Sequence, residues 1–261
     1  AGTFAGGNPK YMEGLGPNMG FDTIAPGDLD LVEKTVTDET AAIMIEPVQG
    51  ESGIHVMAPA FLKGLRTICD RHGLLLIFDE VQCGMGRTGS LFVYQAVGVT
   101  PDIMTIAKAI GGGFPLGACL ASAEAAKGMT YGTHGSTYGG NPLAMAVGCT
   151  AFDMMMEPDF LPHVRKIAGF FNQQLLQLVH EFPAVFEEVR GVGLMLGLKL
   201  APAVVNTDFI NALYGEGLLT VGAGENVIRI LPPLIITETE VREAMAKFVA
   251  AAKKFPAKAS A

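Results

Sequence analysis

Short runs of consecutive apolar residues recur along the first half of the chain. Four of them lie at residues 41–48, 74–78, 103–107 and 116–121. Runs of this length, without an alternating polar face, are typical of strands that are buried on both faces. A helix or a long connection separates these runs, so the pattern predicts a mostly parallel sheet with right-handed crossovers in an α/β domain.

Helical periodicity marks the segment between the first two runs. In residues 59–72, Phe61, Leu65 and Ile68 recur on one face, and Gly73 follows as a stop signal. A shorter helix is predicted after Asp28, whose side chain can cap its N-terminus.

The pattern changes in the second half of the chain. Asn141 and Pro142 open a helix that is predicted to run to about residue 156, and a second helix continues to about residue 180. Short alternating pieces follow, with strands around residues 193–200 and 227–231 and helices around residues 204–215 and 237–255. We therefore predict two domains. Residues 1–156 would belong to the larger one and include the start of a connecting helix, and residues 157–261 would form a small α+β domain.

Composition and charge exclude several classes of function. The chain has 261 residues, of which 49% are hydrophobic and 17% are charged, which is typical of a globular protein with a large buried core. The net charge of −8 argues against a nucleic-acid partner. No apolar run approaches the ~20 residues of a membrane span, and no signal peptide opens the chain. We expect a cytoplasmic enzyme without a membrane partner.

The cysteines and histidines do not suggest a metal site. Cys69, Cys83, Cys119 and Cys149 are widely spaced and have apolar neighbours. This pattern favours reduced, buried thiols over disulfides or a zinc site. The five histidines show no ligand spacing, so no metal is expected.

One lysine stands at the end of an apolar run. Lys108 closes residues 103–107 and is followed almost at once by three glycines at residues 111–113. Because burial disfavours the charged ammonium, a lysine at the end of a buried strand is expected where the neutral amine is needed, as in Schiff-base chemistry. The alternative is a strand-end lysine whose head group reaches solvent.

Two acidic residues share this position in the predicted sheet. Asp79 ends the second apolar run, and Glu46 lies near the end of the first. The carboxyl ends of parallel strands meet at one edge, where such sheets bind ligands. Pyridoxal phosphate needs a lysine for its aldehyde and an aspartate for its pyridinium nitrogen. Asp79 and Lys108 together therefore favour this cofactor over the alternative that Asp79 only caps the next loop.

Two glycine-rich loops are candidates for binding a phosphate. Ser136 and Thr137 lie in a loop just before the helix that starts at Asn141, and two hydroxyls beside a helix N-terminus suit an anion. Residues 84–89 match the G-x-G-x-x-G pattern of dinucleotide-binding proteins. Their context does not fit, because polar residues separate this loop from the preceding strand and no long helix follows at once.

An arginine and a glutamate are candidates for contacting the substrate. Arg229 lies within an apolar strand, where an arginine needs a carboxylate partner. That partner is either an acidic residue of the chain, in a structural ion pair, or the carboxylate of a substrate. Glu51, in the polar loop after the first strand, is open to both interpretations. With Glu46, these residues are our candidate substrate contacts.

Four ordered motifs run through the first half of the chain: Ile-Glu-Pro-Val-Gln-Gly-Glu (45–51), Phe-Asp-Glu-Val-Gln-Cys-Gly-Met-Gly-Arg-Thr-Gly (78–89), Ala-Lys-Ala-Ile-Gly-Gly-Gly-Phe-Pro-Leu-Gly (107–117) and His-Gly-Ser-Thr-Tyr-Gly-Gly-Asn-Pro-Leu-Ala (134–144). Together they closely resemble the motifs of the class III aminotransferases, which depend on pyridoxal phosphate, and within that class those of the acetylornithine aminotransferases. The resemblance implies fold type I, with a mostly parallel large domain and a small α+β C-terminal domain. It also implies transfer of an amino group from N-acetylornithine to 2-oxoglutarate, giving glutamate, in arginine biosynthesis by a homodimer.

The resemblance assigns roles around the cofactor. Lys108 would hold pyridoxal phosphate and carry the proton during the reaction, and Asp79 would pair with the pyridine nitrogen. Val81 would pack on one face of the ring, and Gln82 would lie near its phenolic oxygen.

The resemblance also assigns roles toward the phosphate and the substrate. Ser136 and Thr137 would reach the phosphate of the neighbouring subunit's cofactor. Arg229 would bind the α-carboxylate of glutamate and of 2-oxoglutarate. Glu51 would cover Arg229 while the amino donor reacts.

Members of this class carry a long amino-terminal portion that the chain lacks. That portion contributes a phosphate loop, an aromatic residue that stacks on the ring, and an arginine for the distal carboxylate of 2-oxoglutarate. We therefore expect this chain to cover roughly the last two thirds of an enzyme that is active at full length but not in this form.

Two alternatives share the same motifs. The parent enzyme could be another class III member, of the ornithine or 4-aminobutyrate type. The chain could instead be a catalytically incomplete fragment or scaffold that supplements a partner chain.

Overall fold

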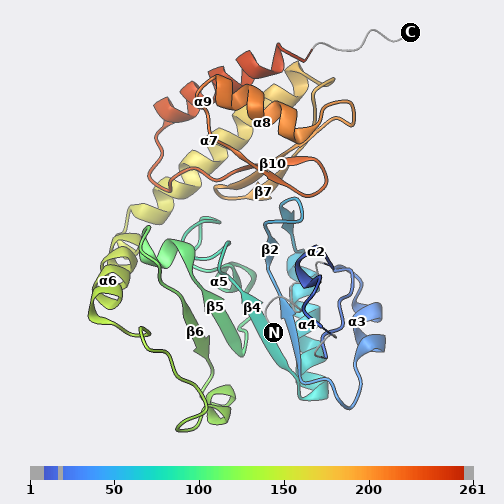
Figure 1. Ribbon diagram of the computed structural model, residues 1–261, viewed down its shortest axis with the longest axis vertical. Coiled ribbons are helices and arrows are strands. Elements are labelled where there is room, and N and C mark those ends of the chain that lie inside the picture. Colours follow the sequence, from blue (N-terminus) through green and yellow to red (C-terminus); the bar gives the residue numbers. More distant parts are fainter. Residues whose placement is uncertain (1–8, 17–19, 256–261) are drawn as a thin grey trace.

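The computed structural model describes residues 9–16 and 20–255. One β-sheet is formed by the first half of the chain and another by the second half, and helix α6 (Pro142–Met156) runs along one side of the molecule between them (Figure 1). The short helix α2 (Pro9–Met12) comes first in the described part. Within that part, no helix combines the length and the apolar character that crossing a membrane requires.

The first sheet has the strand order β1-β4-β5-β6. Its strands are β1 (Ala42–Ile45), β4 (Leu75–Asp79), β5 (Ile103–Ile106) and β6 (Ala118–Ala121). β4 pairs in parallel with both of its neighbours, β1 and β5. In the pairing of β4 with β5, Asp79 lies opposite Thr105. The prediction of a parallel α/β sheet is confirmed for these three strands.

The fourth strand runs in the opposite direction. β6 is antiparallel to β5, with Ile106 opposite Ala118, so the prediction of parallel pairing is wrong at this strand. Between the two strands the chain makes the 3-10 turn η1 (Lys108–Gly111) and a glycine-rich bend. This connection reverses the chain, whereas a parallel neighbour would require a crossover, usually a helix.

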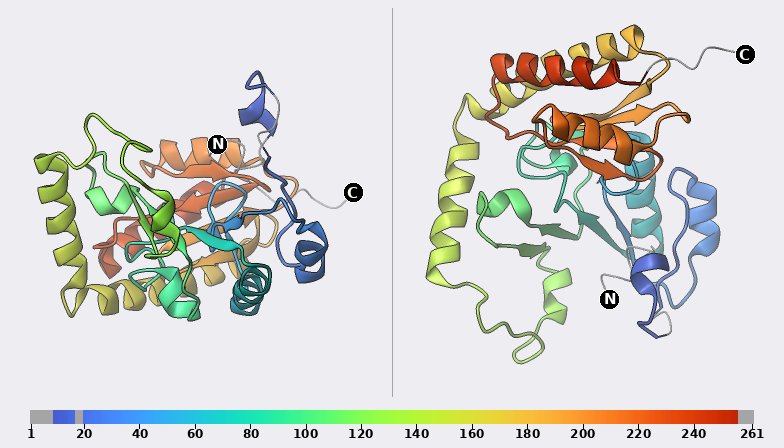
Figure 2. Two further views of the ribbon diagram at one scale, coloured as in Figure 1. Left: turned by 90° about the horizontal axis from the view of Figure 1, so that it is seen from below. Right: turned by 45° about the horizontal axis from the view of Figure 1, so that its top comes forward.

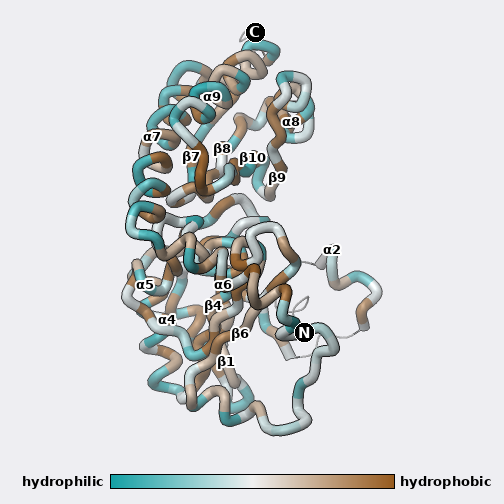
Figure 3. Tube along the Cα trace, turned by 90° about the vertical axis from the view of Figure 1, so that its left-hand side faces the viewer, coloured by the Kyte–Doolittle hydropathy of each residue, from teal (hydrophilic) through white to brown (hydrophobic). Residues whose placement is uncertain are grey.

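Burial also differs from the prediction at both edges of the sheet. Leu76 and Phe78 in β4 are fully buried, while Met44 in β1 is 44% exposed and all four residues of β6 are exposed. Figure 3 shows that β1 and β4 are nevertheless largely hydrophobic along their length. The prediction of burial on both faces is wrong for β1 and β6, because the adjacent helices pack against the face of the sheet that carries Leu76 and Phe78.

The predicted helices of the first half are present. α4 (Pro59–His72) buries Phe61, Leu65 and Ile68 and ends at Gly73, which has a φ of +68°. α3 (Leu29–Thr35) begins after its cap Asp28, whose Oδ1 accepts the N–H groups of Asp30 and Leu31, both in the first turn, at 2.9 and 3.0 Å. The C-terminus of α4 at Gly73 and the N-terminus of α3 at Asp28 thus lie where the sequence signals predict them.

Three short elements complete the first half. β2 (Val48–Gln49) and β3 (His55–Val56) form a two-stranded antiparallel ribbon after β1. α5 (Val93–Val97) lies between β4 and β5, and the 3-10 turn η2 (Ala125–Gly128) follows β6.

The second sheet is antiparallel, with the strand order β7-β8-β10-β9. Its strands are β7 (Phe186–Val192), β8 (Met195–Leu200), β9 (Val221–Ala223) and β10 (Val227–Ile230). The helices α7 (Phe160–Glu181), α8 (Asn206–Gly215) and α9 (Glu238–Ala252) lie on the side of this sheet that faces away from the first one (Figures 1 and 2). The helices follow the prediction, and Thr237 and Glu240 form the expected capping box.

The periodicity did not reveal two strands of this sheet. β7 carries charged residues and is mostly exposed or half-buried, and β9 is three residues long, so neither forms an apolar run. They become strands because β8 and β10, which are largely buried, pair with them at the two edges.

Each sheet has its own apolar core, and a smaller cluster joins the two. The first core lies between α4 and β4, and the second lies between the helices α7 to α9 and the second sheet. The joining cluster contains Val48 and Ile54 from the first half and Met195 and Val227 from the second. The first sheet's loops therefore pack against the second sheet through buried apolar contacts.

The cysteines divide into two pairs, and all four are free thiols. Cys69 and Cys83 are buried, and burial raises the pKa of the Cys69 thiol to about 11. Cys119 on β6 and Cys149 on α6 are exposed, so the prediction of four buried thiols is wrong for these two. Apolar neighbours in sequence do not bury a side chain on an open edge strand or on an outer helix face.

Candidate active site

Three charged residues gather at one edge of the first sheet. Asp79 is the last residue of β4, Glu46 follows β1, and Lys108 follows β5. The pKa of Glu46 is raised, mainly because the carboxyl group is buried. The charge of Asp79 also raises this pKa, whereas the N–H of Gly50 and the charge of Lys108 lower it. The three side chains are thus close enough to interact electrostatically.

Lys108 stands in an unusual backbone conformation. It begins η1 with a φ of +50°, in the left-handed region that residues with a Cβ adopt at a cost of roughly 1–2 kcal/mol. Lys108 is exposed in this structure, as in the alternative of a strand-end lysine whose head group reaches solvent. β5 ends at Ile106, so Lys108 lies in the turn η1 and not in the strand. No ion pair to Lys108 occurs within the described residues.

Asp79 makes one local hydrogen bond. Its Oδ1 accepts the N–H of Val81 at 2.9 Å, which holds the turn after β4, and both residues are half-buried. No protein donor reaches Oδ2 in the described part of the chain. The local turn and a second partner are compatible, because each uses a different carboxylate oxygen.

Glu80 has a structural role that the sequence analysis missed. Its side chain is 1% exposed, and its two oxygens accept the N–H groups of Val93 and Tyr94 at 2.7 and 2.9 Å. The carboxylate therefore caps the N-terminus of α5 from a distant strand. Burial raises its pKa, and the two hydrogen bonds oppose this. The signal in the sequence was a second acidic residue, Glu80, directly after Asp79 at the end of an apolar strand.

Gln82 connects the sheet edge to the second sheet. Its amide lies directly against Gly50, where a Cβ would come within 1.9 Å of Oε1. The Nε2 of Gln82 donates to Glu51 at 3.2 Å, and its Oε1 accepts from Arg229 at 3.4 Å. Two loop residues, Gly50 and Glu51, and Arg229 from the second sheet thus meet at this amide.

Arg229 and Glu51 form an ion pair between the two halves of the chain. Arg229 comes from β10 and its side chain is 10% exposed, whereas the side chain of Glu51 is 62% exposed. The pair uses one terminal nitrogen of the guanidinium, and among the described residues the buried Nε of Arg229 has no hydrogen-bond partner. The arginine is therefore held beside the sheet edge with a donor unused.

Ser136 and Thr137 lie apart from these residues. Both are exposed in the loop between η2 and α6, and Ser136 Oγ accepts the N–H of Gly139 at 3.0 Å. The Asn141 side chain caps α6 by accepting from Ala144 at 2.9 Å, as the sequence indicates. The structure does not bring this loop into hydrogen-bond contact with Lys108 or Asp79 within the described chain.

The loop of residues 84–89, which matches the dinucleotide pattern, joins the two halves. A terminal nitrogen of Arg87 donates to the carbonyl groups of Leu194 and Pro232 at 3.2 and 2.6 Å, and Arg165 donates to Gly89 at 2.8 Å. Burial lowers the pKa of Arg87 to about 10. Gly86 and Gly89 have φ values of +85° and +88°, and a Cβ on Gly89 would lie 2.9 Å from Cγ of Arg165, so the backbone conformation and packing against the second half account for these glycines without a nucleotide.

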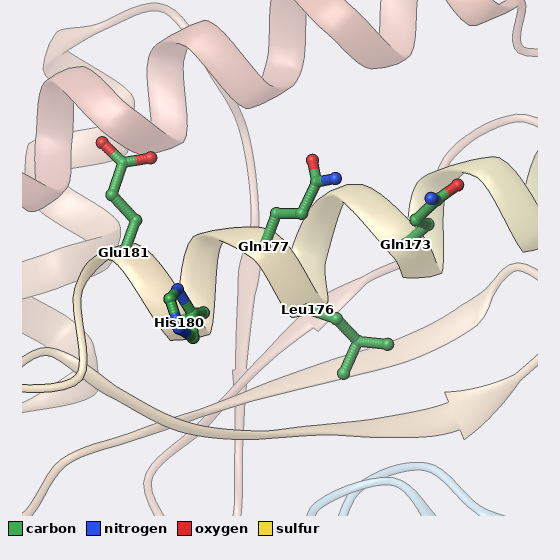
Figure 4. A pocket seen from close by; sticks show the side chains of 5 residues that line it. All are labelled: Gln173, Leu176, Gln177, His180 and Glu181. Atoms are coloured by element: carbon green, nitrogen blue, oxygen red, sulfur yellow. The ribbon is translucent and has the colours of Figure 1, made fainter.

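A surface hollow lies elsewhere and does not contain the candidate residues. It is lined by Gln173, Leu176, Gln177, His180 and Glu181, all from α7. Figure 4 shows that Leu176 and Gln177 point in different directions from this helix. Side chains of a single helix do not enclose a ligand, so we place the site at the sheet edge. Residues 9–16 and 20–255 contain no group of three or more His, Cys, Asp or Glu side chains that could hold a metal.

Comparison with known proteins identifies the family. The family model described as "Aminotransferase class-III" matches residues 23–252. The chain belongs to the class-III aminotransferases. Proteins of this class use pyridoxal phosphate and have the α/β fold type I, as the sequence predicts.

Two curated relatives of this aminotransferase chain are acetylornithine aminotransferases. The acetylornithine aminotransferase of Mesorhizobium japonicum is 57% identical over 250 residues, covering 95% of this chain and 62% of that protein. The acetylornithine aminotransferase of Agrobacterium fabrum is 55% identical over 255 residues, covering 97% of this chain and 63% of that protein. The chain thus spans about three fifths of the length of these relatives.

Solved structures of the class resemble the chain closely. The N-acetylornithine aminotransferase of Stenotrophomonas maltophilia superimposes with a TM-score of 0.82 at 39% identity, over 90% of this chain and 62% of that one. The ornithine δ-aminotransferase of Plasmodium falciparum gives a TM-score of 0.85 at 34% identity, over 92% of this chain and 61% of that one.

Proposed function

We propose that this protein is an acetylornithine aminotransferase, which transfers the amino group of N-acetylornithine to 2-oxoglutarate and forms glutamate in arginine biosynthesis. Two relatives with this name are 57% and 55% identical to the chain, whereas the ornithine δ-aminotransferase of Plasmodium falciparum is 34% identical, which supports this amino donor. The observation that carries the proposal is the meeting of the Lys108–Asp79 edge with Arg229 from the second sheet, connected by Gln82.

The residues at the sheet edge fit pyridoxal phosphate. The Lys108 amine is exposed and unpaired within the described chain, and one oxygen of Asp79 has no protein donor there. When bound, the cofactor would supply an electron sink for the carbon that exchanges its amino group. Asp79 would hold a proton on the pyridine nitrogen, and the Lys108 amine would hold the aldehyde carbon and then move a proton between adjacent carbons.

Two further residues would orient the cofactor from the turn after β4. Val81, half-buried next to Asp79, would pack on one face of the ring. Gln82 would lie near the phenolic oxygen while its amide keeps its hydrogen bonds to Glu51 and Arg229.

Arg229 would bind the α-carboxylate of glutamate or of 2-oxoglutarate. The two terminal nitrogens of its guanidinium together form a fork that binds a carboxylate through two hydrogen bonds, and Glu51 already binds one of them. Glu51 occupies a terminal nitrogen in this structure, so it would withdraw when a dicarboxylate binds and return for N-acetylornithine. Glu46, half-buried between Gly50 and Asp79, would contact the substrate from the floor of the site.

The remaining features of the proposal concern assembly. Ser136 and Thr137, exposed on a loop away from Lys108, would donate to the phosphate of the neighbouring subunit's cofactor in a homodimer. We place the boundary between the large and small domains near residue 157, between the end of α6 and the start of α7. We expect the enzyme to act in the cytoplasm.

Borohydride trapping tests the cofactor site. The full-length protein is incubated with pyridoxal phosphate, reduced with borohydride so that a lysine–pyridoxal linkage becomes a stable secondary amine, and mapped by peptide mass. We expect the label on Lys108, together with an absorbance band that the Lys108→Ala variant loses. Lys127→Ala is the matched control, because Lys127 is an exposed lysine that pairs with Glu124. A label that persists in Lys108→Ala at another lysine would contradict the assignment.

A comparison of amino donors tests the reaction. N-acetylornithine, ornithine and 4-aminobutyrate are offered to the full-length protein with 2-oxoglutarate, and glutamate formation is measured. We expect the highest kcat/KM with N-acetylornithine. A higher value with ornithine or 4-aminobutyrate would assign the protein to that branch of the class. No turnover with any donor would favour a catalytically incomplete chain.

A further inference from the structure

The loop that carries Glu51 is fastened to the second sheet by its backbone. This loop, residues 50–54, connects β2 to β3, and the N–H of Gly224 donates to the carbonyl of Glu51 at 2.8 Å. A Cβ on Gly224 would lie 2.6 Å from the carbonyl oxygen of Ser52, which shows how closely the two backbones approach. Residues 224–226 form the turn between β9 and β10, and this turn ends three positions before Arg229.

One arginine bridges the loop and this turn. The side chain of Arg190, on β7, is 15% exposed. One of its terminal nitrogens donates to Glu225 at 2.6 Å and to the carbonyl of Gly53 at 3.3 Å, and its Nε donates to Glu188 at 3.0 Å. Hydrogen bonding to Arg190 is the main cause that lowers the pKa of Glu225, so this carboxylate is charged at neutral pH.

The turn that receives the loop is itself rigid. Glu225 and Asn226 have φ values of +55° and +61°. Asn226 holds this conformation, because its Nδ2 donates to the carbonyl of Val204 at 2.7 Å and its Oδ1 accepts the N–H of Asn206 at 2.9 Å. On the loop side, His55 contacts Glu225 at 3.3 Å. The turn is therefore a fixed platform, and the movable partner is the loop with Glu51.

We propose that Arg190 is a positioning residue that holds the loop of residues 50–54, and with it Glu51, over Arg229, and thereby sets the balance between dicarboxylate and N-acetylornithine as substrates. This inference rests on the proposed function. Arg190 touches neither the substrate nor Arg229, and it acts through the carbonyl of Gly53 and through Glu225.

The consequence for specificity follows from competition at Arg229. A substrate carboxylate binds Arg229 only in the fraction of molecules in which Glu51 has withdrawn. A contact that holds Glu51 in place lowers that fraction and weakens binding of glutamate and 2-oxoglutarate. It does not weaken binding of a donor that reacts while Glu51 covers the arginine.

Two measurements on the Arg190→Gln variant of the full-length holoenzyme test the inference. The first is amide hydrogen exchange, which reports the Gly224 N–H that Glu51 protects. The second is the ratio of kcat/KM for the glutamate half-reaction to that for the N-acetylornithine half-reaction. We expect exchange at Gly224 and the ratio each to rise about fivefold, which corresponds to roughly 1 kcal/mol at 1.4 kcal/mol per tenfold change. Arg190→Lys keeps the charge and should give smaller changes in both.

Arg71→Gln is the matched control, because it removes an arginine–glutamate pair of 3.0 Å on the far helices α3 and α4. It should change neither measurement. Unchanged exchange at Gly224 in Arg190→Gln would overturn the proposal. So would faster exchange with both half-reactions reduced equally, because that result describes a purely structural residue. If the wild-type enzyme transaminates neither substrate, the proposed function fails, and the exchange result alone then decides whether Arg190 holds the loop.

Discussion

Substituting Gly193 by alanine tests how tightly the two halves of the chain are joined. Gly193 lies in the turn between β7 and β8 and has a φ of +62°. A Cβ there would lie 2.4 Å from the carbonyl carbon of Thr88, 2.5 Å from its Cα, and 2.6 Å from the carbonyl oxygen of Arg87. All three are backbone atoms of the loop at residues 84–89, so no side-chain rotation can relieve the overlap.

The expected loss of stability has three parts. The left-handed backbone costs alanine about 1 kcal/mol more than glycine. Moving the two backbones apart costs about 1–3 kcal/mol, as in other overpacked sites. The displacement also weakens the hydrogen bond from the Leu194 N–H to the Arg87 carbonyl, 2.9 Å long in this structure, which is worth about 1 kcal/mol. We expect Gly193→Ala to lower the free energy of unfolding by about 3–5 kcal/mol.

Urea unfolding followed by far-ultraviolet circular dichroism measures this loss, since the chain has no tryptophan for fluorescence. Two alanine variants separate its parts. Gly73 has a φ of +68° with no atom within 4 Å of a Cβ, so Gly73→Ala should lose only the backbone cost of about 1 kcal/mol. Gly169 is an exposed position within α7 with the same free space, so Gly169→Ala should gain up to about 1 kcal/mol. If Gly193→Ala loses no more unfolding free energy than Gly73→Ala, the two halves do not approach each other as closely as this structure describes.

Three further changes test individual features of the fold. In the native protein at pH 8, a thiol reagent should label the exposed Cys119 and Cys149, while the buried Cys69, with a pKa of about 11, should react only after unfolding. Mass mapping measures the labelling rates, and equal rates at all four thiols would contradict this expectation. Burial raises the pKa of Asp102, but hydrogen bonds from a backbone N–H and from an arginine outweigh burial, so the pKa is lowered in the folded protein. The ionised Asp102 carboxylate therefore stabilises the fold at neutral pH, and this contribution is lost as the pH falls through the pKa of the folded state. Asp102→Asn should therefore flatten the acid limb of the stability profile, and an unchanged acid limb would refute the assignment. Glu80→Ala leaves the first N–H groups of α5 uncapped and should cost about 1–2 kcal/mol in urea unfolding, with a loss below about 0.3 kcal/mol counting against the cap.

Local signals predicted most of the elements. The amphipathic helix at residues 59–72 and the caps at Asp28, Asn141 and Thr237 appear where the sequence places them, because each depends on residues within a few positions of one another. The direction of β6 and the exposure of Cys119 were not predictable in this way. They depend on which face the helices cover and on where the chain reverses after Lys108.

The same division applies to the candidate site. The sequence alone determined the family and the edge of the sheet where Glu46, Asp79 and Lys108 meet, because three strand ends in a parallel sheet must lie together. The residues alone left two partners open for Arg229, an acidic residue of the chain or a substrate carboxylate, and the tertiary structure shows Glu51 in that place, 178 positions away along the chain, as the resemblance implies. Only the tertiary structure shows that Arg190 donates both to Gly53 in the Glu51 loop and to Glu225. Such pairs leave no periodic trace in the sequence, since they depend on how two separately folded sheets dock and not on the spacing of residues within either one.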